Sequence, residues 1–226
     1  MSVPANVVLV HGLWLHGSAM LILARRVGRC GYRASTYSYP TVRVGLTENA
    51  ARLARHCEGL PAGQVHFVAH SMGGAVALTA AGALAPARRG RIVLLGTPFV
   101  DTYSGRRLKE WPGGGAILGR CMAEWLDDPR SARRNVGVNP FDACDVGVIA
   151  GTGRVGLGRL FAPALPQPND GVVSVEETRV PGMRDHVVLP VSHTAMLVSR
   201  EVARQTCAFL SDGKFDRSRL PAASVN

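Results

Sequence analysis

The stretch Val65-His66-Phe67-Val68-Ala69-His70-Ser71-Met72-Gly73-Gly74 decides the fold. Its first half has the apolar character of a buried strand, and it leads directly into small residues and then into an apolar helical segment. A serine hydroxyl is a poor nucleophile, so a catalytic serine stands on a tight turn between strand and helix, where a base can reach its oxygen. The pattern therefore predicts that Ser71 is a nucleophile on such a turn.

The residues on either side of Ser71 fit this interpretation. A tight turn brings the strand and helix backbones close together, which demands small residues two positions before and two positions after the serine, here Ala69 and Gly73. The usual pattern is G-x-S-x-G, so Ala69 departs from it by one methyl group. The alternative is that Ser71 only caps the helix that follows the strand.

Short runs of Val, Ile, Leu and aromatic residues alternate with segments of helical period along the chain, which is typical of a parallel sheet with crossover helices. The nearly all-apolar runs at 7–10, 65–69 and 92–95 suit strands that are covered on both faces. We therefore expect one α/β domain over residues 1–212, with a mostly parallel sheet of about six strands and helices on both faces. The expected strands are 6–10, 33–39, 64–69, 91–95, 145–150 and 185–189, and the expected helices are 18–29, 47–57, 72–86, 115–126 and 194–210.

The connection over residues 96–144 is much longer than a usual loop. Leu118, Cys121, Met122 and Trp125 follow a helical spacing within it. This predicts either a crossover helix packed on the sheet, which we favour, or a partial lid that uses Trp111 beside a glycine-rich hinge. The segment 213–226 is polar and basic, and is predicted to be a loosely held tail.

His193, in Ser192-His193-Thr194, is the best candidate for a general base among the seven histidines. It follows the last expected strand and precedes the last helix, so it lies at the same carboxyl edge of the sheet as Ser71. His70 is next to Ser71 but is expected to point away from it. A histidine that only caps a helix or packs in the core is the alternative for His193.

Asp170, in Asn169-Asp170-Gly171, is the best candidate for the acid that orients this base. It lies between Ser71 and His193 in the chain, as the order Ser, Asp, His requires. An Asp-Gly turn chosen for its geometry is the alternative. Asp145 begins an expected strand, which puts it at the wrong end of the sheet, and the remaining competitors are Asp142, Asp185, Glu176 and Glu177.

The strand at 7–10 ends in His11-Gly12-Leu13-Trp14, where a loop can supply backbone N–H groups to an oxyanion. In the predicted geometry one donor comes from this loop and the other from the residue after the nucleophile, so we assign them to Leu13 and Met72. His11 is expected to be a structural hydrogen-bonding residue. Trp14 and His16 are expected to line the substrate pocket, and the chemistry requires no metal or other cofactor.

The net charge of +10 comes mostly from arginine, since Lys109 and Lys214 are the only lysines among 26 basic residues. The charges are scattered in small groups without a nucleic-acid-binding motif, so no nucleic-acid partner is expected. Attraction to an anionic membrane surface stays open. The five cysteines have no spacing typical of a disulfide framework or a zinc site, which favours buried thiols in a reducing compartment. No secretion signal and no membrane span is visible, so a cytoplasmic location is expected.

The motifs V-H-G-L-W, A-H-S-M-G-G, L-L-G-T-P, N-D-G-V-V-S and S-H-T-A-M-L occur in this order. With them the chain resembles the small bacterial lipases and esterases of the α/β-hydrolase superfamily, and also the GPI-inositol-deacylase-like hydrolases, over residues 6–210. Alanine at the position of Ala69 also occurs among those small lipases. The resemblance implies a minimal six-stranded hydrolase sheet and hydrolysis of small-molecule or lipid acyl esters. Acyl transfer or thioester hydrolysis by the same residues, or a non-catalytic binding protein on the same fold, are the alternatives.

Overall fold

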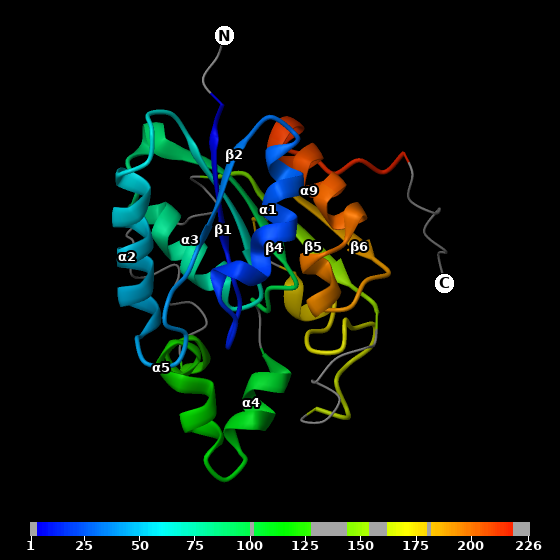
Figure 1. Cartoon of the computed structure of the whole chain (residues 1–226). Helices are drawn as coiled ribbons and strands as arrows, with labels where there is room; N and C mark the ends of the chain where they lie inside the picture. Colours follow the sequence, from blue (N-terminus) through cyan, green and yellow to red (C-terminus); the bar gives the residue numbers. More distant parts are fainter. Residues whose placement is uncertain (1–3, 100–101, 128–143, 154–161, 180–181, 219–226) are drawn as a thin grey trace.

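A six-stranded sheet organises the computed structural model, which describes residues 4–99, 102–127, 144–153, 162–179 and 182–218. The strand order is β2-β1-β3-β4-β5-β6 (Figure 1). All neighbouring strands in the described chain pair in parallel, so the predicted α/β class is confirmed. The strands are β1 (Asn6–Val10), β2 (Arg33–Tyr37), β3 (Val65–His70), β4 (Arg89–Leu95), β5 (Val146–Gly151) and β6 (Asp185–Leu189).

Helices cover both faces of this sheet (Figure 1). On one face lie α1 (Leu21–Gly28) and α9 (Arg200–Asp212), and on the other lie α2 (Leu46–Glu58) and α3 (Gly73–Ala83). Successive strand residues point to opposite faces. Val7 and Leu9 therefore pack with α1 and α9, whereas Val8 and Val10 pack with α2 and α3. This double burial explains why the central strands are almost entirely apolar.

Two expected helices are divided in the structure. The segment 194–210 forms a short 3-10 helix, η4 (Thr194–Leu197), before α9 begins. Ser199 caps α9 because its side chain accepts a hydrogen bond from the Val202 amide. The segment 18–29 likewise begins with a 3-10 helix, η1 (Gly17–Met20). Two further 3-10 helices in the described ranges are η2 (Pro86–Arg88) and η3 (Glu176–Thr178).

Two helices between β4 and β5 lie beyond the carboxyl ends of the strands (Figure 1). They are α4 (Tyr103–Lys109), which the sequence did not predict, and α5 (Gly114–Asp127). A kink at Gly119, where φ is +72°, lets the α5 backbone approach Val42, and the Arg120 amide donates to the Val42 carbonyl at 2.8 Å. The helix expected at 115–126 is therefore present, and it packs against the segment that precedes α2. Residues 100–101 and 128–143 of the segment 96–144, for which a crossover helix was favoured over a partial lid, lie outside the described residues.

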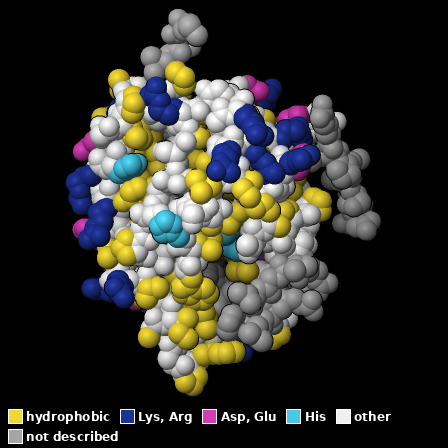
Figure 2. Space-filling view, in the orientation of Figure 1, with side chains coloured by type: hydrophobic (Ala, Val, Ile, Leu, Met, Phe, Trp, Pro, Cys, Tyr) yellow, Lys and Arg dark blue, Asp and Glu magenta, His cyan; other side chains and the backbone are white. Residues whose placement is uncertain are grey.

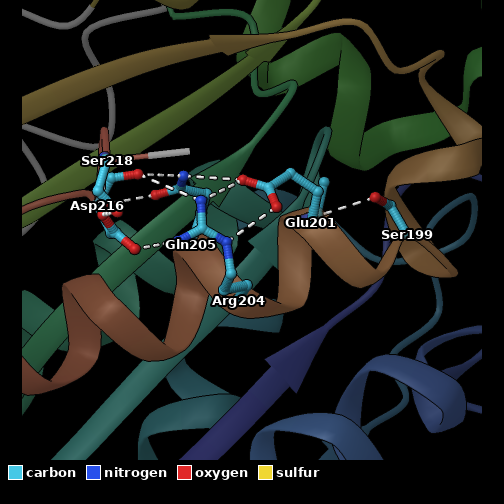
Figure 3. A network of polar contacts seen from close by, with 7 residues as sticks. Ser199, Glu201, Arg204, Gln205, Asp216 and Ser218 are labelled. Atoms are coloured by element: carbon cyan, nitrogen blue, oxygen red, sulfur yellow. Dashed lines mark hydrogen bonds and ion pairs between the residues drawn. The ribbon is translucent and has the colours of Figure 1, made fainter. Parts of the chain in front are cut away.

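The prediction of a loosely held tail after residue 212 is wrong for residues 213–218. Figure 3 shows Asp216 tied to α9 by Arg204 and Gln205. The Gln205 side chain donates to the Asp216 carbonyl at 2.6 Å and accepts from the Asp216 amide at 2.9 Å. Phe215 is buried against Phe209, with ring centroids 5.0 Å apart. The segment is held in place because Phe215 belongs to the same hydrophobic core as Phe209 of α9. Residues 219–226 lie outside the described chain.

The expectation that no disulfide forms is also wrong. Cys30, just after α1, is bonded to Cys207 of α9. The two helices pack side by side, which brings together cysteines that are 177 residues apart, so no local spacing could predict their bond. Cys57, Cys121 and Cys144 are buried free thiols, as expected for small apolar side chains. No helix in the described ranges has the length and hydrophobicity to cross a bilayer.

The buried histidine of β3, His66, makes stability depend on pH. Burial lowers its pKa to about 4, and the Arg91 charge adds to this shift. The unfolded chain takes up this proton near the ordinary value of 6.5, so below that pH the unfolded state binds more protons than the folded state. We expect His66 alone to lower the free energy of unfolding by about 1–2 kcal/mol on going from neutral pH to roughly pH 5.5.

Urea unfolding at the two pH values measures this loss. His66→Asn is the control, since an asparagine can accept the 2.8 Å hydrogen bond that the Arg91 amide gives to His66 but does not titrate. An equal loss of stability in the variant and the wild type would show that other groups cause the pH dependence.

Candidate active site

Ser71 stands on the turn between β3 and α3 in a backbone conformation that is rare for serine. Its φ is +54°, in the left-handed region that residues other than glycine seldom adopt. The Ser71 amide donates to the Leu95 carbonyl at 2.9 Å, and its own carbonyl accepts from the Gly74 amide at 2.9 Å. These hydrogen bonds hold a strained turn of the kind that clusters at functional sites.

The small residues around Ser71 have the steric role that the sequence predicts. A Cβ atom on Gly73 would lie 2.4 Å from the His11 carbonyl oxygen and 2.7 Å from the Val10 carbonyl oxygen. Any larger residue there would separate α3 from the end of β1. Ala69, by contrast, is fully buried in β3, so its methyl group is accommodated.

His193 and Asp170 form a buried hydrogen-bonded pair. The His193 Nδ1 atom lies 2.7 Å from Asp170 Oδ2, and the His193 amide donates to the Asp170 carbonyl at 3.0 Å. A carboxylate only accepts, so Nδ1 is the donor in this bond, and the neutral tautomer that fits it has its lone pair on Nε2. The imidazole is thereby held in the form that a general base requires.

Backbone amides satisfy the second oxygen of Asp170. Its Oδ1 atom accepts from the Val172 amide at 2.9 Å and from the Val173 amide at 2.7 Å. Asp170 is almost fully buried, and a buried carboxylate is costly unless it is hydrogen-bonded in this way. The Asp-Gly turn therefore both shapes the loop and fixes the carboxylate, so the two interpretations of Asp170 are compatible.

The loop that follows β4 contacts Ser71, His193 and Asp170. Gly96, with φ at +53°, lies so close to the pair that a Cβ atom on it would be 2.9 Å from Asp170 Oδ2 and 3.0 Å from His193 Nδ1. The Thr97 hydroxyl donates to the Ser71 carbonyl at 2.9 Å. This loop is the L-L-G-T-P motif, and sequence reasoning assigned it no role.

Replacing Thr97 with valine removes the hydrogen bond to the Ser71 carbonyl, which supports the strained turn by about 1.4 kcal/mol. For a nucleophile at Ser71, kcat is expected to fall about tenfold while KM stays nearly unchanged. Steady-state kinetics on a soluble ester measure the two parameters separately. Thr97→Ser keeps the hydroxyl and should retain most of the activity. If valine and serine had the same effect, the hydrogen bond to Ser71 would not matter.

The loop after β1 lies directly against Ser71. A Cβ atom on Gly12 would be 2.9 Å from the Ser71 Cβ atom, so the backbone of Gly12 and Leu13 runs beside the nucleophile candidate. Within the described chain, the amides of Leu13 and Met72 have no protein acceptor. Both amides are therefore free to donate to a bound group.

A cavity of about 300 Å³ opens beside Ser71 and His193. Its walls are mainly apolar, and α4 and α5 contribute Leu108, Leu118 and Met122. These two helices thus cover the cavity. The lining residues are Gly12, Leu13, Trp14, Leu15, His70, Ser71, Pro98, Thr102, Ser104, Gly105, Leu108, Leu118, Met122, Val172, Val173, His193 and Thr194.

The sequence profile of the alpha/beta hydrolase family matches residues 7–216, which is most of the chain. The chain belongs to the alpha/beta hydrolase family. By sequence it matches no curated protein.

Solved structures of low sequence identity share the fold of this alpha/beta hydrolase. The mature lipase BlEst2 of Bacillus licheniformis is 19% identical, with a TM-score of 0.73 over 90% of this chain and 89% of the lipase. A metagenomic carboxyl esterase is 19% identical, with a TM-score of 0.64 over 85% of this chain and 65% of the esterase. A pyrethroid hydrolase of Sphingobium faniae is 15% identical, with a TM-score of 0.53 over 93% and 98% of the two chains.

Two histidines near the site, His11 and His16, are not among the residues that line the cavity. His11 is buried and structural as expected, because its Nε2 accepts from the Tyr39 amide at 3.2 Å and its pKa is lowered by burial. His16, which was expected to line the substrate pocket, is not among the residues that line this cavity, and its side chain caps η1 by accepting from the Ser18 amide. Trp14 does line the cavity.

His70 was expected to point away from Ser71, yet it lines the same cavity. Its Nε2 donates to the His193 carbonyl at 3.0 Å, and the two imidazole centroids are 4.6 Å apart. Burial lowers its pKa well below the ordinary value, so His70 is neutral. Its position one residue before Ser71 was the only signal in the sequence for this contact.

Proposed function

We propose that this hydrolase cleaves carboxylic esters through an acyl-enzyme on Ser71. Ser71 is the nucleophile, His193 is the general base and Asp170 orients the base. The observation that carries the proposal is the buried 2.7 Å hydrogen bond between His193 Nδ1 and Asp170 Oδ2, at a cavity that Ser71 also lines. An apolar cavity beside these groups suits the acyl chain of a small-molecule or lipid ester.

In this mechanism His193 Nε2 removes the proton of the Ser71 hydroxyl as the oxygen attacks the acyl carbonyl. The Leu13 and Met72 amides stabilise the oxyanion of the tetrahedral intermediate, each by about 3–4 kcal/mol. His193 then gives the proton to the departing alcohol. Water attacks the acyl-enzyme in the second half, with His193 again as base, and releases the acid and free Ser71.

Hydrolysis of p-nitrophenyl esters of increasing acyl length tests this function. We expect activity on short and medium esters, since the 300 Å³ cavity holds only a limited chain. Parallel assays with acyl thioesters, and with an added alcohol as acceptor, distinguish a thioesterase or an acyltransferase from an esterase. A folded protein that is inert in all of these assays would favour a non-catalytic binding protein.

The place of action is a further part of the proposal. A cytoplasmic location was expected from the sequence, but the Cys30–Cys207 disulfide is at the surface and would be reduced there. We therefore place the working protein in an oxidising compartment. Intact mass after alkylation of the unfolded protein, with and without reductant, tests whether two cysteines of the isolated protein are joined in a disulfide. Five thiols that react without reductant would contradict the placement in an oxidising compartment.

A further inference from the structure

Exposed apolar side chains occur in the segments that form the cavity. Trp14 is part of the cavity wall, and its indole nitrogen donates to the Ile117 backbone carbonyl of α5 at 2.8 Å, which joins α5 to the cavity wall at this point. Trp111 lies between α4 and α5. About half of the surface of each of these three residues is exposed, between 47% and 51%. Figure 2 shows hydrophobic side chains over the α4–α5 lobe, below a hollow in the surface.

A second group of exposed apolar side chains belongs to the segments that follow the cavity residues Leu15 and Thr194. Leu21 and Ile22 begin α1, directly after η1, and Val198 follows η4, which begins at the cavity residue Thr194. The Arg26 guanidinium donates to the Val198 carbonyl, which joins these two segments. Leu21, Ile22 and Val198 are 42–48% exposed. Such a concentration of large apolar side chains marks an interaction surface.

Arginines gather next to this second group. Arg25 and Arg29 are exposed on and just after α1, and Arg200 is exposed at the start of α9. The segment of α1 has no acidic residue, and Glu201 of α9 is already bound to Arg204 at 2.6 Å. Figure 2 shows the resulting group of basic side chains over α1 and α9, on the same face as the hollow.

We propose that this face docks on an anionic phospholipid bilayer and presents the cavity mouth to the acyl chains. Apolar side chains enter the interface between headgroups and chains, while the arginines are attracted to anionic headgroups. A nucleic acid would use the arginines but would leave the apolar side chains without a partner. The identity of a lipid ester as substrate rests on the proposed function, whereas docking itself requires no catalysis.

Sedimentation with vesicles tests the proposal, using phosphatidylcholine alone and phosphatidylcholine mixed with phosphatidylglycerol. Arg25→Glu with Arg29→Glu changes the charge of the proposed face. Arg52→Glu with Arg55→Glu is the matched control on α2, which lies on the opposite face of the sheet. Each pair removes two positive charges and adds two negative ones, so the net charge falls from +10 to +6 in both.

We expect the wild type to bind the mixed vesicles and to bind neutral ones weakly. The α1 pair should reduce the partition coefficient about 25-fold or more, and the α2 pair should reduce it much less. Trp111→Ser with Ile117→Ser should also weaken binding, whereas Val188→Ser, at an exposed apolar residue of β6, should not.

Equal binding to both kinds of vesicle, or an equal effect of the two arginine pairs, would overturn the proposal. So would binding to double-stranded DNA that depends on the α1 arginines when vesicle binding is absent. The same measurements with Ser71→Ala separate docking from catalysis, because that variant should bind vesicles like the wild type. Vesicle binding without any esterase activity would therefore contradict only the proposed function, and activity without vesicle binding would contradict only the docking.

Discussion

Replacing Ser71 with alanine is expected to lower kcat on a carboxylic ester about 100,000-fold, because the covalent intermediate can no longer form. The substitution removes one oxygen atom from a turn that backbone hydrogen bonds and Thr97 hold in place, so the fold should be retained. Stopped assays at high enzyme concentration measure the residual rate, and circular dichroism checks the fold.

Ser211→Ala is the matched control, since Ser211 is an exposed serine on α9, away from the cavity. It should leave kcat unchanged. Activity of Ser71→Ala within tenfold of the wild type would assign the chemistry to another residue.

Replacing Asp170 with asparagine is expected to lower kcat about 10,000-fold. The asparagine has nearly the same size, but its amide can donate a hydrogen bond to His193 Nδ1. This favours the tautomer that carries its proton on Nε2, which cannot accept the proton of Ser71. The effect should fall on kcat much more than on KM, because Asp170 is buried behind His193 and does not line the cavity.

Asp145→Asn is the control for the loss of a carboxylate. Asp145 binds Arg91 and Arg184 just before β5, at the end of the sheet opposite the cavity. That substitution should affect stability slightly and kcat hardly at all. If Asp170→Asn behaved like Asp145→Asn, then Asp170 would be a turn residue without a catalytic role.

The sequence predicted the sheet well because its central strands are buried on both faces. Val7 to Val10 and Val65 to Ala69 have no polar alternation that could be mistaken for a surface strand or an amphipathic helix, except at His66. The placement of Ser71, Asp170 and His193 also followed from sequence, since loops after parallel strands meet at one edge of a sheet. The motif around each residue then selected it from the competitors.

The features that the sequence missed depend on contacts between distant segments. The Cys30–Cys207 disulfide requires α1 and α9 to pack together, which no local pattern reveals. The role of Thr97 depends on the hydrogen bond that its hydroxyl donates to the Ser71 carbonyl, which no local sequence pattern indicates. The segment 213–218 reads as a polar tail, yet Phe215 and Asp216 find their partners on α9. The composition of such a segment does not indicate whether it packs against the rest of the protein, because that depends on partners far away in the sequence.

Labelling with a fluorophosphonate, followed by peptide mapping, shows whether Ser71 is an activated nucleophile. The reagent reacts with a serine hydroxyl only where a base activates it and an oxyanion site holds the phosphonyl oxygen. We expect a single adduct on Ser71 in the wild type, no adduct in Ser71→Ala, and a strongly slowed reaction in Asp170→Asn. An adduct on any other residue, or a folded wild type that does not react, would contradict this expectation.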